Sequence, residues 1–301
     1  MPPHKAYVAY RAANAISRAL PGPVVQPWAK ATGAIAQRVM SGRREMVERH
    51  QLRVRPDLNE ADLEQAVRNT FTNYTQYWLE SFRLPGTPPD VLDAGIRAEG
   101  FEYLQAAIDA GTGCVLAMPH LGAWEWAAFW ITAVHHLPVS AVVEAVEPPE
   151  LARWFVDLRA EFGIEVMPLD ANAGTGAARA LAANRVLTLL CDRDVAGGGI
   201  EVEFFGERTT LPAGPATLAL RSGAPLIPAT CYFEGDGHYG LARPPLDTTR
   251  QGKFRQDVAR VTQDLAHEFE TMIRRAPEQW HLLQPNWPSD HLAAASSAAG
   301  R

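Results

Sequence analysis

Cysteines are few in this chain, and long hydrophobic runs are missing from it. Cys114, Cys191 and Cys231 show no Cys-x-x-Cys spacing, and each lies in a short apolar run. Disulfide frameworks and structural zinc sites need clustered cysteines, so we expect three reduced core thiols and no metal site. No apolar run approaches the roughly 20 residues of a membrane-spanning helix. Lys5 and Arg11 interrupt any signal-peptide core, so the sequence predicts a soluble, intracellular protein.

Three familiar functional signatures are also missing. The Gly-x-Ser-x-Gly elbow of serine hydrolases does not occur, and the glycines at 174–176 lack the rest of a dinucleotide-binding fingerprint. Nothing resembles an RNA-binding strand, a zinc finger or a basic recognition helix, so no nucleic-acid partner is expected. Hydrophobic residues make up 47% and charged residues 21% of the chain, which excludes a wholly disordered protein.

Positive charge is concentrated at the N-terminus. Residues 1–55 carry ten basic and two acidic side chains, a net charge of +8, whereas the rest of the chain carries −14. Aromatic and aliphatic side chains such as Tyr7, Tyr10, Ile16 and Trp28 are interleaved with these charges. This mixture favours a helix lying in the headgroup region of an anionic membrane. The alternative is an ordinary solvated helical face.

The first 90 residues have a helical pattern with breaks at 21–23 and 55–57. Asn59 is predicted to cap a helix that continues to Phe82, because an acidic residue follows three positions later. We therefore assign residues 1–90 to a basic, helical N-terminal portion of the same domain, one that docks on a membrane.

Beyond residue 90 the pattern changes to short apolar runs that alternate with amphipathic stretches. The predicted strands are 114–118, 139–144, 164–168, 186–191 and 225–233. The predicted helices are 101–110, 123–135, 149–162, 174–184, 213–222 and 253–275. Such alternation predicts an α/β fold with a largely parallel central sheet flanked by helices. Residues 91–290 form this core, and residues 291–301, rich in Ala, Ser and Gly, are predicted to be a disordered tail.

The first chemical motif follows the strand predicted at 114–118. His120 comes two residues after it, and Glu125 lies at the start of the next helix. A carboxylate bonded to one imidazole nitrogen fixes the tautomer and leaves the other nitrogen as a base. The amides of the helix start, with Gly122 allowing close approach, are candidate donors to a phosphate or an oxyanion. The alternative is a structural histidine.

The second motif, Asp192-Arg193-Asp194, follows the strand predicted at 186–191 and leads into a triple-glycine loop. Ligands bind at the carboxyl ends of parallel strands, so this cluster is a candidate charged site with a mobile cover. If the two strands are neighbours, Asp192 competes with Glu125 for His120, and spacing does not choose between them. The alternative is a surface turn.

Several motifs occur together in a familiar order. These are His120-Leu121-Gly122-Ala123-Trp124-Glu125, Asp192-Arg193-Asp194, Phe204-Phe205-Gly206-Glu207, Leu211-Pro212-Ala213-Gly214-Pro215-Ala216 and Trp280-His281-Leu282-Leu283-Gln284-Pro285-Asn286-Trp287. Over roughly residues 60–290 the chain resembles the bacterial lipid acyltransferases that include the lipid A lauroyl/myristoyl transferases. Within that family it is most similar to the actinobacterial phosphatidylinositol mannoside acyltransferases.

The resemblance implies an acyl-CoA-dependent O-acyltransferase that needs no metal or prosthetic group. It would move a long-chain acyl group such as palmitoyl from acyl-CoA, its co-substrate, to a mannose hydroxyl of a phosphatidylinositol mannoside. The expected location is peripheral, on the anionic inner leaflet at the cytoplasmic face of the plasma membrane. Alternatives are an acyltransferase for another glycolipid or a lysophospholipid, and a non-catalytic peripheral lipid-binding protein.

Site residues carried over by position follow from the same resemblance. His120 would be the general base and Asp192 the acid that supports it, which leaves Glu125 a supporting place at the helix start. Glu144 and Arg159 are expected to form a charged pair lining the cavity, with Arg159 facing the thioester end of the donor.

The remaining expectations are looser. Arg193 would support the charged site, and the loop near Gly198 and the helix around Arg221 would contact acyl-CoA. Apolar side chains that follow His120 are candidate walls of an acyl groove, or else plain core: Trp124, Trp126, Phe129 and Trp130.

The chain also departs from the family pattern. Asp192 stands where the mannoside enzymes usually carry Glu, which shortens its reach to His120 by one methylene. Ala123 replaces a frequent Asn, and residues 145–147 lack the basic side chains expected after Glu144. These departures put the acceptor in doubt more than the acyl transfer.

Overall fold

A computed structural model describes residues 14–17, 24–144 and 149–292. Its centre is a seven-stranded sheet with the order β1-β9-β8-β2-β5-β3-β4. The strands are β1 Ile96–Glu99, β2 Cys114–Met118, β3 Val139–Val143, β4 Glu165–Pro168, β5 Val186–Leu190, β8 Leu226–Glu234 and β9 Gly237–Ala242. Among these described strands only the β8–β9 pair is antiparallel. The predicted α/β fold with a largely parallel sheet is therefore confirmed.

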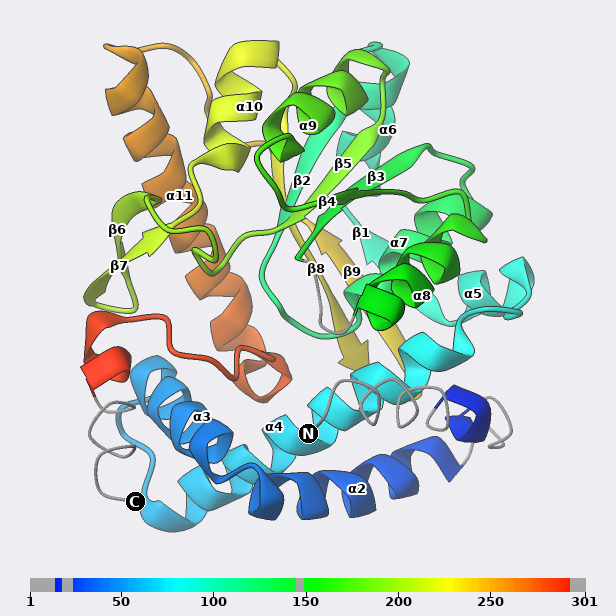
Figure 1. Ribbon diagram of the computed structural model, residues 1–301, viewed down its shortest axis with the longest axis vertical. Helices are drawn as coiled ribbons and strands as arrows, with labels where there is room; N and C mark the ends of the chain where they lie inside the picture. Colours follow the sequence, from blue (N-terminus) through cyan, green and yellow to red (C-terminus); the bar gives the residue numbers. More distant parts are fainter. Residues whose placement is uncertain (1–13, 18–23, 145–148, 293–301) are drawn as a thin grey trace.

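Helices cover both faces of this sheet (Figure 1). One face carries α9 Ala173–Ala182, α10 Gly214–Ser222 and α11 Phe254–Arg275. The other face carries α5 Pro89–Ala94, α6 Phe101–Asp109 and α7 Trp124–Ala133. Helix α8, Pro149–Ala160, lies near the edge strand β4. Strand β2 shows how the two cores arise. Val115 and Ala117 point into the first core, whereas Cys114 and Leu116 point into the second. A strand buried on both sides gives the continuous apolar run seen in the sequence.

Three N-terminal helices lie beyond the carboxyl ends of β2 and β8 (Figure 1). They are α2 Val25–Val39, α3 Ser41–Val54 and α4 Glu60–Arg83. The side chain of Asn59 accepts a hydrogen bond from the amide of Asp62 at 3.0 Å, so the predicted cap of α4 is confirmed. A Cβ atom at Gly33 would lie 2.9 Å from the backbone of Thr72, so α2 crosses α4 closely at this glycine.

Four strands were missed by the sequence patterns. Two of them are the edge strand β1 and its glycine-containing neighbour β9, which carry little apolar periodicity. The others form a separate hairpin, β6 Ile200–Phe204 and β7 Glu207–Leu211. Its two turn residues, Phe205 and Gly206, have φ angles of 52° and 74°. Positive φ at both positions is the geometry of a type I′ hairpin.

Four of the N-terminal arginines are paired with carboxylates of the protein itself, so the expectation that they face an anionic partner is wrong for these four. The ion pairs are Arg44 with Glu48 and Glu64, Arg49 and Arg53 with Asp290, and Arg55 with Glu278. Much of the predicted basic and aromatic segment, including Lys5, Tyr7 and Tyr10, lies outside the described residues. So does most of the predicted tail, residues 293–301. No helix in the described part of the chain is long and apolar enough to cross a membrane.

Candidate active site

His120 lies directly beyond the carboxyl end of β2, where the chain turns toward α7. The backbone of His120 is held in place, because its carbonyl accepts a hydrogen bond from the amide of His281 at 2.7 Å. The next two residues form isolated β-bridges, Leu121 with Trp280 and Gly122 with Cys231 of β8. The imidazole itself keeps 27% of its surface exposed, so a substrate can reach it.

Asp192 is the carboxylate that meets His120. Strands β2 and β5 are parallel neighbours in register, which brings their carboxyl ends together. The Oδ1 atom of Asp192 lies 2.6 Å from Nδ1 of His120, and Oδ2 accepts the His120 amide at 3.0 Å. Although Asp192 is one methylene shorter than the Glu expected here, its reach is sufficient.

The surroundings of Asp192 keep it ionised although it is fully buried. Burial by itself would raise the pKa of this carboxyl, but His120 and the indole N–H of Trp280, 2.8 Å from Oδ2, hold the pKa below its usual value. An ionised carboxylate only accepts hydrogen bonds, so Nδ1 of His120 must carry the proton and donate it. The other ring nitrogen, Nε2, is left as a base.

Glu125 does not reach His120, although the spacing allowed it. Its carboxylate forms a two-pronged ion pair with the guanidinium of Arg159, with one bond from Nη2 to Oε1 and another of 3.3 Å from Nε to Oε2. The hydroxyl of Tyr77 lies 3.5 Å from Oε1. Glu125 extends from the first turn of α7 to Arg159 of α8, which explains why the alternative dyad does not form.

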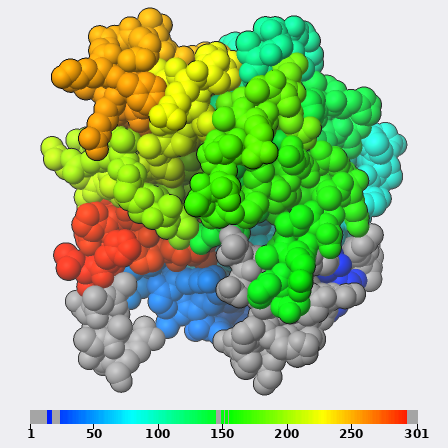
Figure 2. All heavy atoms as spheres, turned by 45° about the horizontal axis from the view of Figure 1, so that its top comes forward, coloured from blue at the N-terminus to red at the C-terminus, as the bar shows by residue number. Residues whose placement is uncertain are grey.

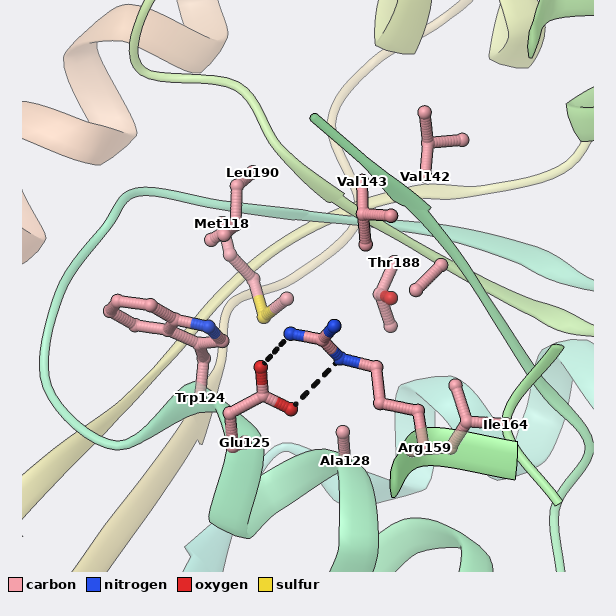
Figure 3. A pocket seen from close by; sticks show the side chains of 11 residues that line it. Met118, Trp124, Glu125, Ala128, Val142, Val143, Arg159, Ile164, Thr188 and Leu190 are labelled. Carbon is pink, nitrogen blue, oxygen red and sulfur yellow. Dashed lines mark hydrogen bonds and ion pairs between the residues drawn. The ribbon is translucent and has the colours of Figure 1, made fainter. Parts of the chain in front are cut away.

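An apolar pocket adjoins His120 at the carboxyl ends of three strands (Figure 3). Its lining includes Met118 of β2, Val143 of β3 and Leu190 of β5, together with Trp124 at the start of α7. The ring of Trp124 stands 5.7 Å from that of His120, so the pocket and the imidazole share one wall. Figure 3 shows the Glu125–Arg159 pair bridging α7 and α8 beside this space.

Only one of the four aromatic residues proposed as groove walls lines this pocket. That residue is Trp124, whereas Trp126 stacks on His238 at 4.2 Å, and Phe129 and Trp130 belong to the buried core. For Phe129 and Trp130 the alternative interpretation, plain core, is therefore correct, whereas Trp126 is partly buried beside the core.

Three residues that contact the dyad were quoted from the sequence only for the resemblance. Trp280 donates to Asp192 as described, and Asn286 donates from Nδ2 to the Asp192 carbonyl at 3.1 Å. His281 is buried against Tyr74, Tyr77 and other rings, and neither of its ring nitrogens has a hydrogen-bond partner among the described residues. Burial lowers the pKa of His281 to about 3, so its ring is neutral. The sequence patterns could not predict these contacts, because the three residues lie far from His120 along the chain.

Gly122 serves the backbone rather than a ligand. It has a φ of 68°, and a Cβ atom there would lie 2.1 Å from the carbonyl oxygen of Cys231. The amide of Ala123 donates to that same carbonyl. Only glycine permits this approach to β8, which holds the start of α7 in place.

Residues 3–289 match the family of bacterial lipid A biosynthesis acyltransferases. The chain belongs to this family. Two relatives are the phosphatidylinositol mannoside acyltransferases of Mycolicibacterium smegmatis and Mycobacterium tuberculosis, and each is 40% identical to the chain. The matches span 227 and 223 residues, which are 74% and 72% of this chain and 73% and 69% of the respective relatives.

The expectation that Glu144 pairs with Arg159 is wrong. Glu144, at the end of β3, binds Arg193 instead, with 2.7 Å between Oε2 and Nη2. Arg159 is already held by Glu125 inside the pocket, so its charge is not free for Glu144. The residues after Glu144, at 145–148, lie outside the described part of the chain.

The two positions assigned loosely to acyl-CoA lie in different places. Gly198 is exposed in a loop that Asp194 closes, because its carboxylate accepts the amides of Gly197 at 3.0 Å and Gly199 at 2.8 Å. Arg221 is in the last turn of α10, which leads into the start of β8. It therefore lies at the amino ends of the strands, opposite His120, and its contact with acyl-CoA stays a prediction.

No metal site is formed by the described residues, since no three His, Cys, Asp or Glu side chains converge as metal binding requires.

Proposed function

We propose that this protein transfers a long-chain acyl group from acyl-CoA to a mannose hydroxyl of a phosphatidylinositol mannoside. One observation carries the proposal: a partly exposed imidazole, oriented by a buried carboxylate, stands next to Trp124, which lines an apolar pocket. The acceptor is inferred from the two relatives, which carry that substrate in their names.

The geometry supports general base catalysis. Nε2 of His120 takes the proton of the acceptor hydroxyl as its oxygen attacks the thioester carbonyl, and a carbon–oxygen bond forms. The tetrahedral intermediate then loses the thiolate of CoA as the carbon–sulfur bond breaks, and the proton on Nε2 passes to that sulfur. Asp192 stabilises the imidazolium between these steps. The base acts on the acceptor directly, so we expect sequential kinetics and no covalent acyl-enzyme.

The lining of the pocket beside His120 matches an acyl chain in polarity. The pocket is lined mainly by aliphatic and aromatic side chains, and its one charged pair, Glu125–Arg159, is internally compensated. An apolar chain entering there would leave its thioester near the imidazole. The amides of Trp124 and Glu125 in the first turn of α7 are the candidate donors to the developing oxyanion.

CoA release from palmitoyl-CoA, measured with and without phosphatidylinositol mannoside, tests the proposal. We expect the acceptor to stimulate release and an acylated glycolipid to appear in the same molar amount. Stimulation by another glycolipid or a lysophospholipid alone would keep acyl transfer and overturn the acceptor. Release without any acceptor-dependent product would overturn the transfer itself, and an isolated acylated protein would overturn the direct mechanism.

The outer face of α2 is the proposed site of docking on the cytoplasmic leaflet. Val24, Trp28, Ile35 and Val39 recur at helical spacing and are 38%, 44%, 60% and 77% exposed. Arg38, on the same side of the helix, is exposed and has no ion pair among the described residues. Exposed aromatic and aliphatic side chains next to cations are typical of helices that lie in a membrane interface.

Replacing Trp28, Ile35 and Val39 together with serine is expected to weaken binding to vesicles that contain phosphatidylinositol. The loss should be about tenfold or more, because three apolar side chains no longer enter the interface. Co-sedimentation measures it, and thermal unfolding is the control, since exposed side chains contribute little to stability. Unchanged sedimentation of a folded variant would show that α2 is not the docking face.

A further inference from the structure

A C-terminal strap, residues 280–290, follows the short helix η2 Pro277–Gln279 and wraps over the catalytic carboxylate. Two of its side chains hold Asp192 from different sides. The indole of Trp280 donates to the carboxylate, and the amide of Asn286 donates to the main-chain carbonyl. The strap thus supplies two of the contacts that set where Asp192 stands.

The strap is held at its far end by Asp290. This carboxylate is fully buried and accepts hydrogen bonds from two residues of α3, Arg49 at 2.9 Å and Arg53 at 3.2 Å. It also accepts the strap's own amides at Asn286 and Trp287, at 3.2 and 3.3 Å. Figure 2 shows this last part of the chain (red) lying against the α3 region (blue) on the surface.

His50 of α3 ties the two ends of the strap together. Its Nε2 lies 3.1 Å from Oδ2 of Asp290, and its Nδ1 lies 2.9 Å from the carbonyl oxygen of Leu282. Its ring stands 5.4 Å from each of the indoles of Trp280 and Trp287. A movement of Asp290 therefore reaches Trp280 through one rigid ring.

We propose that Asp290, His50 and Arg53 form a clasp that positions Asp192 for catalysis, and that Asp290 is a positioning residue of the reaction. The inference rests on the proposed acyl transfer. Buried ion pairs add little net stability compared with packed apolar side chains, so stability alone gives no reason for a charged cluster here. The clasp instead fixes the strap in one register, and through Trp280 and Asn286 it fixes the Asp192–His120 geometry.

The variant Asp290→Asn tests the clasp, since it removes the charge while keeping the size. We expect kcat to fall about tenfold to a hundredfold with little change in KM, because a shift of an ångström at a catalytic group has an effect of this size. In the Asp192→Asn background the same change should cause no further loss. The Trp280 indole N–H signal, observed by NMR and assigned with Trp280→Phe, should shift.

Asp257→Asn is the matched control. Like Asp290, Asp257 is buried, forms an ion pair with an arginine (Arg250) and accepts a hydrogen bond from a backbone amide (Gln251). Unlike Asp290, it lies at the start of α11 and has no hydrogen bond to a residue of the strap. It should leave kcat and the Trp280 signal unchanged. An equal loss in this control, or a loss for Asp290→Asn that persists in the Asp192→Asn background, would overturn the clasp.

A second pair of variants covers the case in which Asp290→Asn does not fold. His50→Gln keeps a donor toward Asp290, whereas His50→Asn keeps a donor only toward Leu282, so the first should retain more activity than the second. Equal activity of the two would overturn the clasp. The two proposals also fail separately. If the wild type shows no acceptor-dependent CoA release, the transfer is overturned. If the Trp280 signal does not shift in folded Asp290→Asn, the clasp is overturned. Where Asp290→Asn does not fold, the same signal is read in folded His50→Asn.

Discussion

Replacing His120 with alanine is expected to lower acceptor-dependent CoA release on the order of 10²–10⁴-fold, the contribution of a well-placed general base. Nε2 of this imidazole is the base that the dyad leaves free, beside the apolar pocket. KM for palmitoyl-CoA should change little, because the pocket walls remain. Steady-state kinetics with both substrates varied measures the two effects separately.

His267→Ala is the control for this prediction, since His267 is exposed on α11 and belongs neither to the dyad nor to the pocket lining. It should match the wild type in every parameter. If His120→Ala also retained full acyl transfer, the enzyme mechanism would be wrong. Retained glycolipid binding without transfer in the wild type would favour the alternative function, a non-catalytic lipid-binding protein.

The second large effect is expected for Asp192→Asn, with a loss in kcat on the order of 10²–10⁴-fold. An asparagine has no charge to stabilise the imidazolium, and its amide can turn its NH₂ group toward Nδ1 and impose the wrong tautomer. Because the side chain has the same shape and Trp280 can still donate to the amide oxygen, the variant should fold. The measurement is again kcat, with thermal unfolding to verify the folded fraction.

Glu125→Gln provides the contrast, because Glu125 was the rival partner. Its loss would leave the guanidinium of Arg159 buried without a counter-charge, which costs about 3–5 kcal/mol of unfolding free energy. The expected defect is therefore in stability, with kcat per folded molecule less affected than in Asp192→Asn. Should Glu125→Gln be fully folded and inactive while Asp192→Asn is active, Glu125 would be the true partner of His120.

The strands buried on both faces were predictable from the sequence alone. Each of the five predicted strands agrees with the structure to within one residue at either end. For β2, β5 and β8 the reason is that a fully covered strand must be apolar throughout. Strand β1 was missed, since an edge strand leaves part of its surface in water and needs no continuous apolar run. Strand β9 lies between β1 and β8, and it was missed because its two glycines interrupt the apolar pattern. The β6–β7 hairpin was missed for a related reason, as its strands are short and half exposed.

The sequence by itself determined the fold class, the family resemblance and the two strand ends that carry the chemistry. These follow from local patterns, because apolar periodicity and short motifs involve residues that are neighbours along the chain. The partner of His120 was decided only by the tertiary structure. Both Glu125 and Asp192 were within reach on paper, and the adjacency of β2 and β5 selected Asp192.

The tertiary structure also decided what the N-terminal charges do. Arg49 and Arg53 looked like part of a membrane-facing cluster, yet they bind a carboxylate more than 200 residues away, at Asp290. Charge counts along a chain record how many cations there are but not which carboxylates fold against them. Electrostatic interactions act through space, over a few ångströms, and only folding brings those distant groups within that range.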